Sequence, residues 1–443
     1  MEIKTMADST ESSVSVQRNY FLKDLANLFR YSFVTPDPNE VDLCAAQLVK
    51  RTERLTMIFQ VSRNGFNQNN SIKNTLGYRR YNRLDWIIGI ISLINALRCI
   101  VLICDSSETV AIILGDPLFR SKDRQIIIIF ALIFLFTMVI FREVILSLEA
   151  KGDLNLLSVL LSCRNGFNPF CLRMNDVNMN RFRLTIILVS IVAYCTMLVV
   201  PFFLSVGFFI PFLANPWTYK IPELAFCGFL WSLSDIFIAT FLLNAILGFS
   251  WYFICALSFH LYRLMDLLDK ADYLKKSIKV ASNERNIKLL SLLIIRRLNS
   301  FELATRKLRY VLFYYVFVFA SSGDVYIFLG LIVRVHNDLL ANLLAVAGIF
   351  ILPSIGVFGL AFGNLISKLD KLTVGLHQLT LMNRLSLSTS SKVLEVMNRA
   401  AGPYNGLKIG DFATLEKSFF ILFIVENISI LMLFTVNIGP LIN

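Results

Sequence analysis

Long apolar segments, separated by segments rich in charge, run through the whole chain. An α-helix needs about twenty apolar residues to cross the hydrocarbon core of a bilayer, and such a run must be helical because the backbone finds no water to bond with in lipid. We therefore predict an all-α integral membrane protein with seven transmembrane helices, at residues 84–104, 125–141, 184–213, 225–259, 310–333, 339–365 and 418–438. The third and fourth runs exceed one crossing, so we expect these helices to tilt or protrude.

The composition leads to the same class. Hydrophobic residues make up 56% of the 443 residues and charged residues only 17%, which is more apolar than a soluble core of this size needs. The first 83 residues carry many charges and no early apolar block. We therefore expect no cleaved targeting sequence.

The placement of basic residues predicts the orientation in the membrane. Of the 43 lysines and arginines, 37 lie in the amino-terminal segment and in the loops after the second, fourth and sixth helices. Because positive loops stay cytoplasmic, we predict a cytosolic amino terminus and an extracellular carboxyl terminus. The net charge of +12 then indicates a basic cytosolic face beside anionic lipid, and no binding of nucleic acid.

The connection after the fourth helix has a helical pattern of its own. Leu261, Leu264 and Leu268 recur at three- and four-residue spacing, with lysines alongside, which is typical of an amphipathic helix. The fourth helix is therefore expected to continue into the cytosol, and residues 287–310 return in the same style. Such helices could rest on the bilayer surface. The favoured interpretation is that they pack on each other and on residues 367–411 as an inner bundle that holds subunits together.

These patterns predict six consecutive regions. They are a cytosolic amino-terminal segment (1–83), transmembrane helices 1–4 (84–260), a cytosolic amphipathic helical connection (261–309), transmembrane helices 5–6 (310–365), a cytosolic helical anchor segment (366–416), and transmembrane helix 7 as the candidate pore helix (417–443).

The last helix contains polar residues near its middle. Glu426, Asn427 and Ser429 interrupt an otherwise apolar run, where an ionised side chain is costly unless it faces water or a partner. Rings of carboxylates or amides are what a cation pathway uses, so these residues are candidate pore residues. The alternative is that Glu426 is protonated or hydrogen-bonded between helices of one subunit.

Three further charges lie inside apolar helices at overlapping depth. Arg98, Asp235 and Asp324 could pair and so lower the cost of each charge, or they could shape a polar pocket open to the outside. Trp231 and Tyr326 could form the walls of such a ligand pocket, although most aromatic residues of membrane helices only pack or lie in interfacial belts.

A bend is predicted in the sixth helix. Pro353 removes a backbone hydrogen bond and kinks the helix, and Gly356 follows it. These two residues are the candidate gating hinge, with static packing as the alternative.

Cys104 and Cys227, near outer helix ends, could form a disulfide, but unpaired cysteines are the favoured interpretation.

Other functional classes lack their signatures. The three histidines (260, 336, 377) have no metal-ligand spacing, and no phosphate-binding glycine loop, HExxH or GxSxG motif occurs. We therefore predict that the protein is not an enzyme and holds neither metal nor cofactor. A G-protein-coupled receptor needs the opposite orientation, and a secondary transporter needs repeats in two halves. A sensory receptor that signals through G proteins or other partners, and a transporter, remain alternative functions.

The arrangement resembles the insect chemoreceptor superfamily, specifically gustatory receptors and their nematode gustatory-receptor-like relatives. The resemblance covers the order of the whole chain, and locally the segment "GLKIGDFATLEKSFFILFIVENISILMLF", where Gly410 and Phe412 precede the seventh helix. The family signature there is Thr-Tyr, five hydrophobic residues, then Gln-Phe. This chain has Ile428 and Ser429 at the first place, and Thr435 and Val436 at the second, which indicates a divergent member.

The resemblance implies a function. It implies a ligand- or stimulus-gated cation channel in the plasma membrane of sensory or other neurons, assembled as a homo- or hetero-tetramer. Four copies of the last helix would surround the pore, with Thr435 and Val436 among the pore residues, and each subunit would hold a ligand among its other helices. The stimulus is expected to be a small molecule or, as for some nematode relatives, light or hydrogen peroxide.

Overall fold

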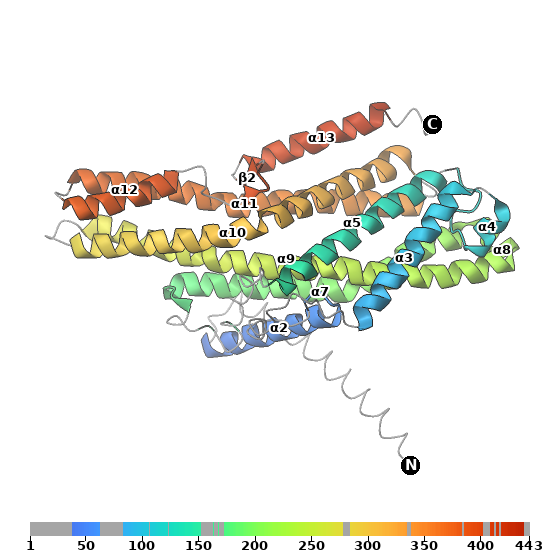
Figure 1. Cartoon of the computed structure of the whole chain (residues 1–443), viewed down its shortest axis with the longest axis horizontal. Helices are drawn as coiled ribbons and strands as arrows, with labels where there is room; N and C mark the ends of the chain where they lie inside the picture. Colours follow the sequence, from blue (N-terminus) through green and yellow to red (C-terminus); the bar gives the residue numbers. More distant parts are fainter. Residues whose placement is uncertain are drawn as a thin grey trace, which may run out of the picture.

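The computed structural model describes residues 38–62, 83–105, 107–122, 124–151, 163, 167, 172–277, 284–334, 338–382, 385–401, 408–411, 413–415 and 418–437. Their regular secondary structure is helical except for one pair of two-residue antiparallel strands. In chain order (Figure 1) the elements are α2 (Pro38–Ile58), α3 (Arg83–Cys104), α4 (Glu108–Ile113), α5 (Arg124–Ala150), α7 (Asp176–Ala214), α8 (Pro216–Lys220), α9 (Pro222–Ser277), α10 (Glu284–Ile327), the π-helical turn η3 (Phe328–Val333), α11 (Asp338–Met382), α12 (Leu387–Ala401), β1 (Lys408–Ile409), β2 (Ala413–Thr414) and α13 (Phe419–Asn437).

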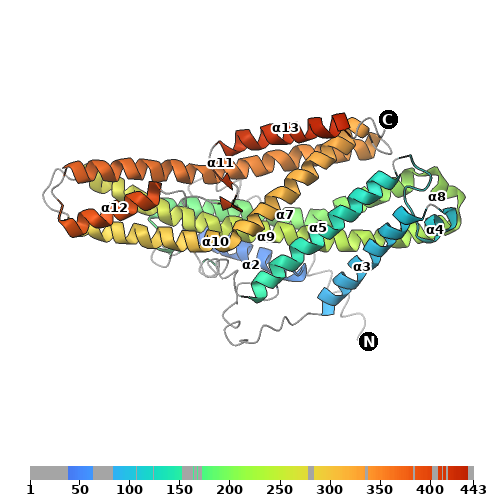
Figure 2. The same cartoon turned by 45° about the horizontal axis from the view of Figure 1, so that its top comes forward.

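The bundle is elongated, and four long helices run along its length. Figures 1 and 2 show α7, α9, α10 and α11 along the long axis, with α3 and α5 crossing obliquely at one end. That end also carries α4 and α8, and we call it the α8 end; the opposite end carries α12, and we call it the α12 end. Consecutive long helices therefore connect the two ends in alternating directions.

Five of the described helices are long and apolar enough to cross a membrane. They contain the segments Arg83–Cys104, Arg124–Glu149, Asp176–Ala214, Pro222–Tyr273 and Leu308–Val333, which correspond to the first five predicted spans. The prediction of a helical, multi-pass membrane protein is confirmed at this level. The apolar parts described for α11 and α13, Asp338–Leu352 and Ile421–Asn437, are shorter, so the sixth and seventh crossings stay predictions.

The fourth and fifth helices extend far beyond one crossing. The 56 residues of α9 correspond to about 84 Å at 1.5 Å per residue, against about 30 Å of hydrocarbon. The helix continues without a break to Ser277, and α10 returns from Glu284, as the amphipathic pattern indicated. Helix α12 packs against α10 and α11 at the α12 end (Figure 2), so part of the segment 367–411 joins these extensions in one helical assembly.

Helix α5 is longer than the predicted second span, which ended at residue 141. Arg142 interrupts the apolar run, yet the helix continues to Ala150. Arg142 is only 3% exposed, and its Nη2 donates to Asp85 Oδ1 of α3 at 2.5 Å. A paired charge can stay inside a helix bundle because its partner offsets the desolvation cost.

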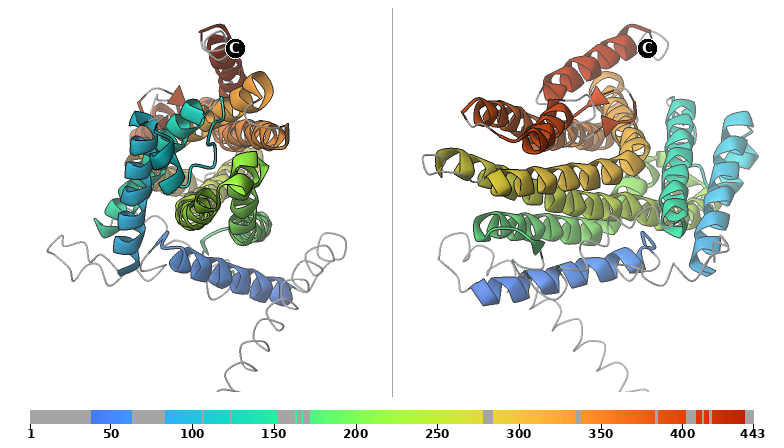
Figure 3. Two further views of the ribbon diagram at one scale, coloured as in Figure 1. Left: turned by 90° about the vertical axis from the view of Figure 1, so that its right-hand side faces the viewer. Right: turned by 60° about the vertical axis from the view of Figure 1, so that its left-hand side comes forward.

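The described part of the amino-terminal segment lies against α7. Figure 3 shows α2 along the outside of the bundle, beside α7. Asp42 of α2 accepts a hydrogen bond from Arg183 Nη1 at 2.6 Å, and the Thr56 hydroxyl bonds with Tyr252 of α9 at 2.8 Å. Helix α2 is thus attached to the membrane helices by polar contacts at both of its ends.

Candidate functional site

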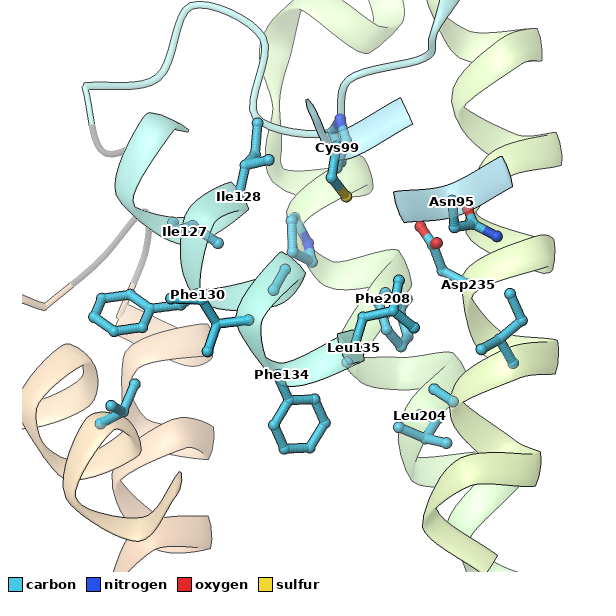
Figure 4. Close-up of a pocket in the computed structure, with 18 of the residues that line it drawn as sticks. Asn95, Cys99, Ile127, Ile128, Phe130, Phe134, Leu135, Leu204, Phe208 and Asp235 are labelled. Atoms are coloured by element: carbon cyan, nitrogen blue, oxygen red, sulfur yellow. The ribbon is translucent and has the colours of Figure 1, made fainter. Parts of the chain in front are cut away.

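A cavity of about 470 Å³ lies among α3, α5, α7, α9, α10 and α11, toward the α8 end. Most of its lining is apolar. Figure 4 shows Asn95 and Asp235 at one side, on α3 and α9, and Phe130 and Phe134 of α5 at the other. A small molecule held here would contact apolar side chains over most of its surface and polar groups at one corner.

Arg98 organises the polar corner. Its Nη1 donates to Asp235 Oδ2 at 2.9 Å, its Nε to the Leu114 carbonyl at 2.9 Å and its Nη2 to the Gly115 carbonyl at 3.0 Å. The guanidinium carbon also lies 4.8 Å from the centre of the Trp231 ring, within the range of a cation–π interaction. The Arg98 side chain is 5% exposed, whereas that of Asp235 is 24% exposed, so the carboxylate is the more open member of the pair.

Asn95 adds an amide to the same corner. Its Nδ2 donates to the Ser234 hydroxyl at 2.8 Å and to the Ile91 carbonyl at 3.0 Å. Its Oδ1 is buried and has no hydrogen-bond partner, although Asn95 lines the cavity. A ligand that donates a hydrogen bond would satisfy this acceptor, because a buried polar atom without a partner is costly.

The segment after α4 closes the α8 end of the cavity, and Asp116, Pro117 and Leu118 are part of the lining. Asp116 is 1% exposed; it accepts from the Leu118 backbone N–H at 3.0 Å and forms an ion pair with Arg124. Such a turn is held in one conformation by its own carboxylate. We call residues 114–119 the cap.

The cap is also attached to α8 and α9. The Asn215 amide donates to the carbonyls of Pro117 at 3.2 Å and Phe119 at 3.1 Å. Gly115 has a positive φ of 57°, and a Cβ built there would lie 2.3 Å from the backbone nitrogen of Gly228. Only glycine fits at this position, because any side chain would overlap the α9 backbone.

The structure brings most of the predicted pocket residues together. Arg98 and Asp235 meet at the polar corner, and Tyr326 lines the same cavity on α10, its ring 6.2 Å from the Phe134 ring. Trp231 contacts Arg98 but is not among the residues that line the cavity. Asp324 does not join them: it is 1% exposed and neither carboxylate oxygen has a hydrogen-bond partner. Of the three charges predicted at overlapping depth, only Arg98 and Asp235 form a pair.

Helix α13 lies on the outside of the bundle, beside α11 (Figure 2). One face is attached: Phe423 and Asn427 are buried, and Leu431 and Phe434 pack against the η3 residues Phe328 and Leu329. The left view of Figure 3, seen from the α8 end, shows α13 at the periphery. The rest of its surface faces away from the subunit.

The five predicted pore residues lie on different faces of α13. Glu426, Ser429 and Val436 are exposed and, at about 100° per residue, lie within an arc of about 80°. Thr435 is exposed but lies about 100° from Val436. Asn427 faces its own subunit, where its Nδ2 donates to the Phe423 carbonyl at 2.5 Å and its Oδ1 has no partner.

The predicted hinge falls in α11, which passes helically through Pro353 and Gly356; the surroundings of these two side chains are outside the described part of the structure. A second irregularity, not expected from the sequence, is η3 at the end of α10. There a Cβ built on Gly330 would lie 2.5 Å from the Ala341 carbonyl oxygen, so glycine permits the close approach of α11. Single π-helical turns often mark functional sites.

The sequence did not predict three residues of the cavity and its cap, because only the packing of the helices brings them there. Asn95, Asp116 and Asn215 reach the cavity or its cap only in three dimensions, although the turn sequence around Asp116 and the Asn-Pro pair at 215 are typical of a structured loop and a helix start. In the structure Cys104 and Cys227 are free thiols. The described residues contain no cluster of three His, Cys, Asp or Glu side chains suited to a metal ion.

No protein-family model matches the sequence, and a search of curated proteins finds no significantly similar chain.

Proposed function

We propose that the protein is a stimulus-gated cation channel of chemosensory type in the plasma membrane, resembling gustatory receptors. Seven helices cross the bilayer, with the amino terminus and the α12 end in the cytosol and the α8 end outside. Four copies, identical or mixed, surround a pore lined by α13. Cations pass through this pore, and a small molecule or another sensory stimulus opens it.

The observation that carries the proposal is the placement of α13. It is attached to its subunit by one face, while Glu426 and Ser429 lie on the open side. A carboxylate within an apolar helix needs water or a partner. Glu426 is exposed on the open side of α13, so its water or partner must come from outside the described part of the subunit. Four such faces around a common axis would give a ring of carboxylates, which attracts cations.

The cavity supports the chemosensory part of the proposal. Its volume of about 470 Å³ is within the usual range for small-molecule sites, which are mainly apolar with few polar groups. Asn95 and Asp235 supply those polar groups here. A ligand with an apolar body and a hydrogen-bond donor at one end fits this pattern.

A continuous set of packed side chains connects the cavity with α13. Phe130 of α5 and Leu329 of η3 line the cavity, and both belong to the apolar cluster that includes Leu431 and Phe434 of α13. The rings of Phe328 and Phe434 are 5.6 Å apart. A ligand that moves the cavity wall would therefore also move the attached face of the pore helix.

The pore assignment is tested by whole-cell recording from cells that express the chain alone, with a panel of small organic compounds, hydrogen peroxide and light. We expect a cation current with no added G protein, and Glu426→Gln to lower its preference for cations over anions. Glu223→Gln, the same charge change at an exposed position in the first turn of α9, is the control. Unchanged selectivity in Glu426→Gln would remove this residue from the pore, and a current that vanishes on G-protein blockade would point to a receptor that signals through partners.

The cavity assignment has its own pair of variants. Gly207 lines the cavity, and a Cβ at this position meets no atom within 4 Å, so the Cβ of a substituted leucine fits there and Gly207→Leu is expected to fill part of the cavity. Gly89, on the exposed side of α3, has equally open surroundings and serves as the matched control. We expect Gly207→Leu to abolish the response to the stimulus and Gly89→Leu to retain it. Equal responses would contradict the cavity as the ligand site.

A further inference from the structure

Basic side chains from three segments converge where α9 and α10 leave the apolar part of the bundle toward the α12 end. The rings of His260 on α9 and Phe301 on α10 lie 6.4 Å apart, which places the two antiparallel helices side by side. Arg263 lies one turn further along α9 and Arg297 one turn earlier on α10, on the same sides of their helices. The two arginines are therefore at the same level.

A third arginine comes from the segment before α7. The Asn175 backbone N–H donates to Asp266 Oδ1 at 3.0 Å, and the Asn178 amide donates to Asp269 at 2.9 Å. These bonds hold the start of α7 against α9, beside Arg263. Arg173, two residues before Asn175, has a positive φ of 55°, a conformation that costs a non-glycine residue about 1 kcal/mol.

The charges of this group are not balanced. Arg263 is repelled by the positive charges of Arg297 and Arg173. Burial and the charge of Arg173 lower the pKa of Arg297, and the negative charge of Asp266 raises it. Asp266 is 1% exposed and also binds Lys270 at 2.8 Å. Asp266 therefore offsets only part of the positive charge of this group, through Arg297 and Lys270.

The donors of the group also lack acceptors. Within the part of the chain that the structure describes, the guanidinium groups of Arg173, Arg263 and Arg297 form no hydrogen bond or ion pair. Arg263 Nε and His260 Nε2 are buried without a partner, and Arg263 instead lies 4.8 Å over the Phe259 ring. A buried donor without an acceptor costs about 1–3 kcal/mol, so a ligand that supplies an acceptor to Arg263 Nε would stabilise the folded protein. Arg173 is exposed and Arg297 is half-buried, so a ligand that arrives from outside the bundle can reach both guanidinium groups.

We propose that Arg173, Arg263 and Arg297 form a binding site for a phosphate group carried by a phosphate ester. Phosphate presents several acceptor oxygens and up to two negative charges, and the planar guanidinium fork matches its geometry. The site lies where the charged part of α9 begins, directly after the predicted span 225–259. The ester is therefore either the headgroup of a phosphorylated lipid in the adjacent leaflet or a soluble phosphate ester on that side of the membrane.

The test uses the purified full-length protein in phosphatidylcholine nanodiscs, with the midpoint of thermal unfolding as the readout. One arm adds phosphatidylinositol bisphosphate to the nanodisc lipid, and the other adds inositol hexakisphosphate to the buffer. A ligand that binds the folded state raises the midpoint. We expect a rise in one or both arms, and an affinity weaker by about tenfold or more in Arg263→Gln and Arg297→Gln, because each loses a charge-assisted hydrogen bond.

Arg296→Gln is the matched control, because Arg296 is the exposed neighbour of Arg297 on the same helix and the charge change is identical. It should keep the response to the probe. Without any probe, Arg263→Gln should raise the midpoint, because the substitution removes repulsion among like charges.

A response to the lipid probe alone identifies a headgroup site, and a response to the soluble probe alone identifies a soluble ester. The proposal is overturned if neither probe raises the midpoint, if Arg296→Gln weakens binding as much as Arg297→Gln, or if Arg263→Gln lowers the midpoint without a probe, as a purely structural arginine would.

Discussion

Replacing Asp235 by asparagine removes the negative charge that is bonded to the Arg98 guanidinium. The two carbonyl bonds from Leu114 and Gly115 remain, so the cap keeps its attachment, but a charge that is 5% exposed loses its partner. Removing one member of a buried ion pair costs about 3–5 kcal/mol. We expect about 3 kcal/mol for Asp235→Asn, at the low end of this range, because the carboxylate is 24% exposed toward the cavity.

The loss is measured as the midpoint of thermal unfolding in detergent, where this cost corresponds to a decrease of roughly 5 °C for a chain of this size. The control is Glu108→Gln, which breaks the pair between Glu108 and Arg120 at the same end of the molecule, where both side chains are exposed (59% and 41%). Exposed pairs contribute about 0–1 kcal/mol, so its midpoint should barely change. Equal shifts in both variants would refute the reasoning that burial makes the Arg98–Asp235 pair strong.

Three further predictions concern single sites. Gly115→Ala should detach the cap and lower the unfolding midpoint, because the new Cβ would meet the Gly228 backbone at a residue with positive φ; an unchanged midpoint would show that the cap is free to move. Asp324→Leu should raise the midpoint rather than lower it, since it replaces a buried carboxylate without partners, which costs about 1–3 kcal/mol, by an apolar side chain of similar size; a loss like that of Asp235→Asn would reveal a partner for Asp324. Hydrogen bonds from the hydroxyls of Ser386 and Thr389 and from the Ser386 N–H lower the pKa of Glu284. Their stabilising effect is therefore complete at pH values above the usual pKa of a glutamate, and it is lost as the pH falls through the lowered pKa. Hydrogen exchange of α12, corrected for intrinsic rates, should therefore accelerate on acidification in the native protein but not in Glu284→Gln.

The apolar pattern by itself determined where the membrane helices run. A backbone in lipid must be helical and a crossing needs a fixed length, so composition along the chain is enough to place five helices that the structure contains. The amphipathic spacing after residue 260 likewise determined that α9 continues as one helix. Arg142 shows the limit of this reasoning, because its charge ends an apolar run and its partner Asp85 lies on another helix.

The sequence also placed the charges of the candidate pocket, but not their partners. Arg98 and Asp235 were expected at similar depth because helical rise converts residue number into height. Height does not tell which way a side chain points. Only the packing of α3 against α9 decides that Arg98 meets Asp235, while Asp324 is buried without a partner.

The tertiary structure alone decided which face of each helix is attached and which is open. On α13 it separates Glu426 from its neighbour Asn427, because residues one apart on a helix differ by about 100° in direction. It also brings residues that are far apart in sequence close enough to interact, such as Arg173 and Arg297, whose charges repel each other. The physical reason is that local pattern governs the formation of a helix, whereas direction and distance between side chains depend on how helices pack.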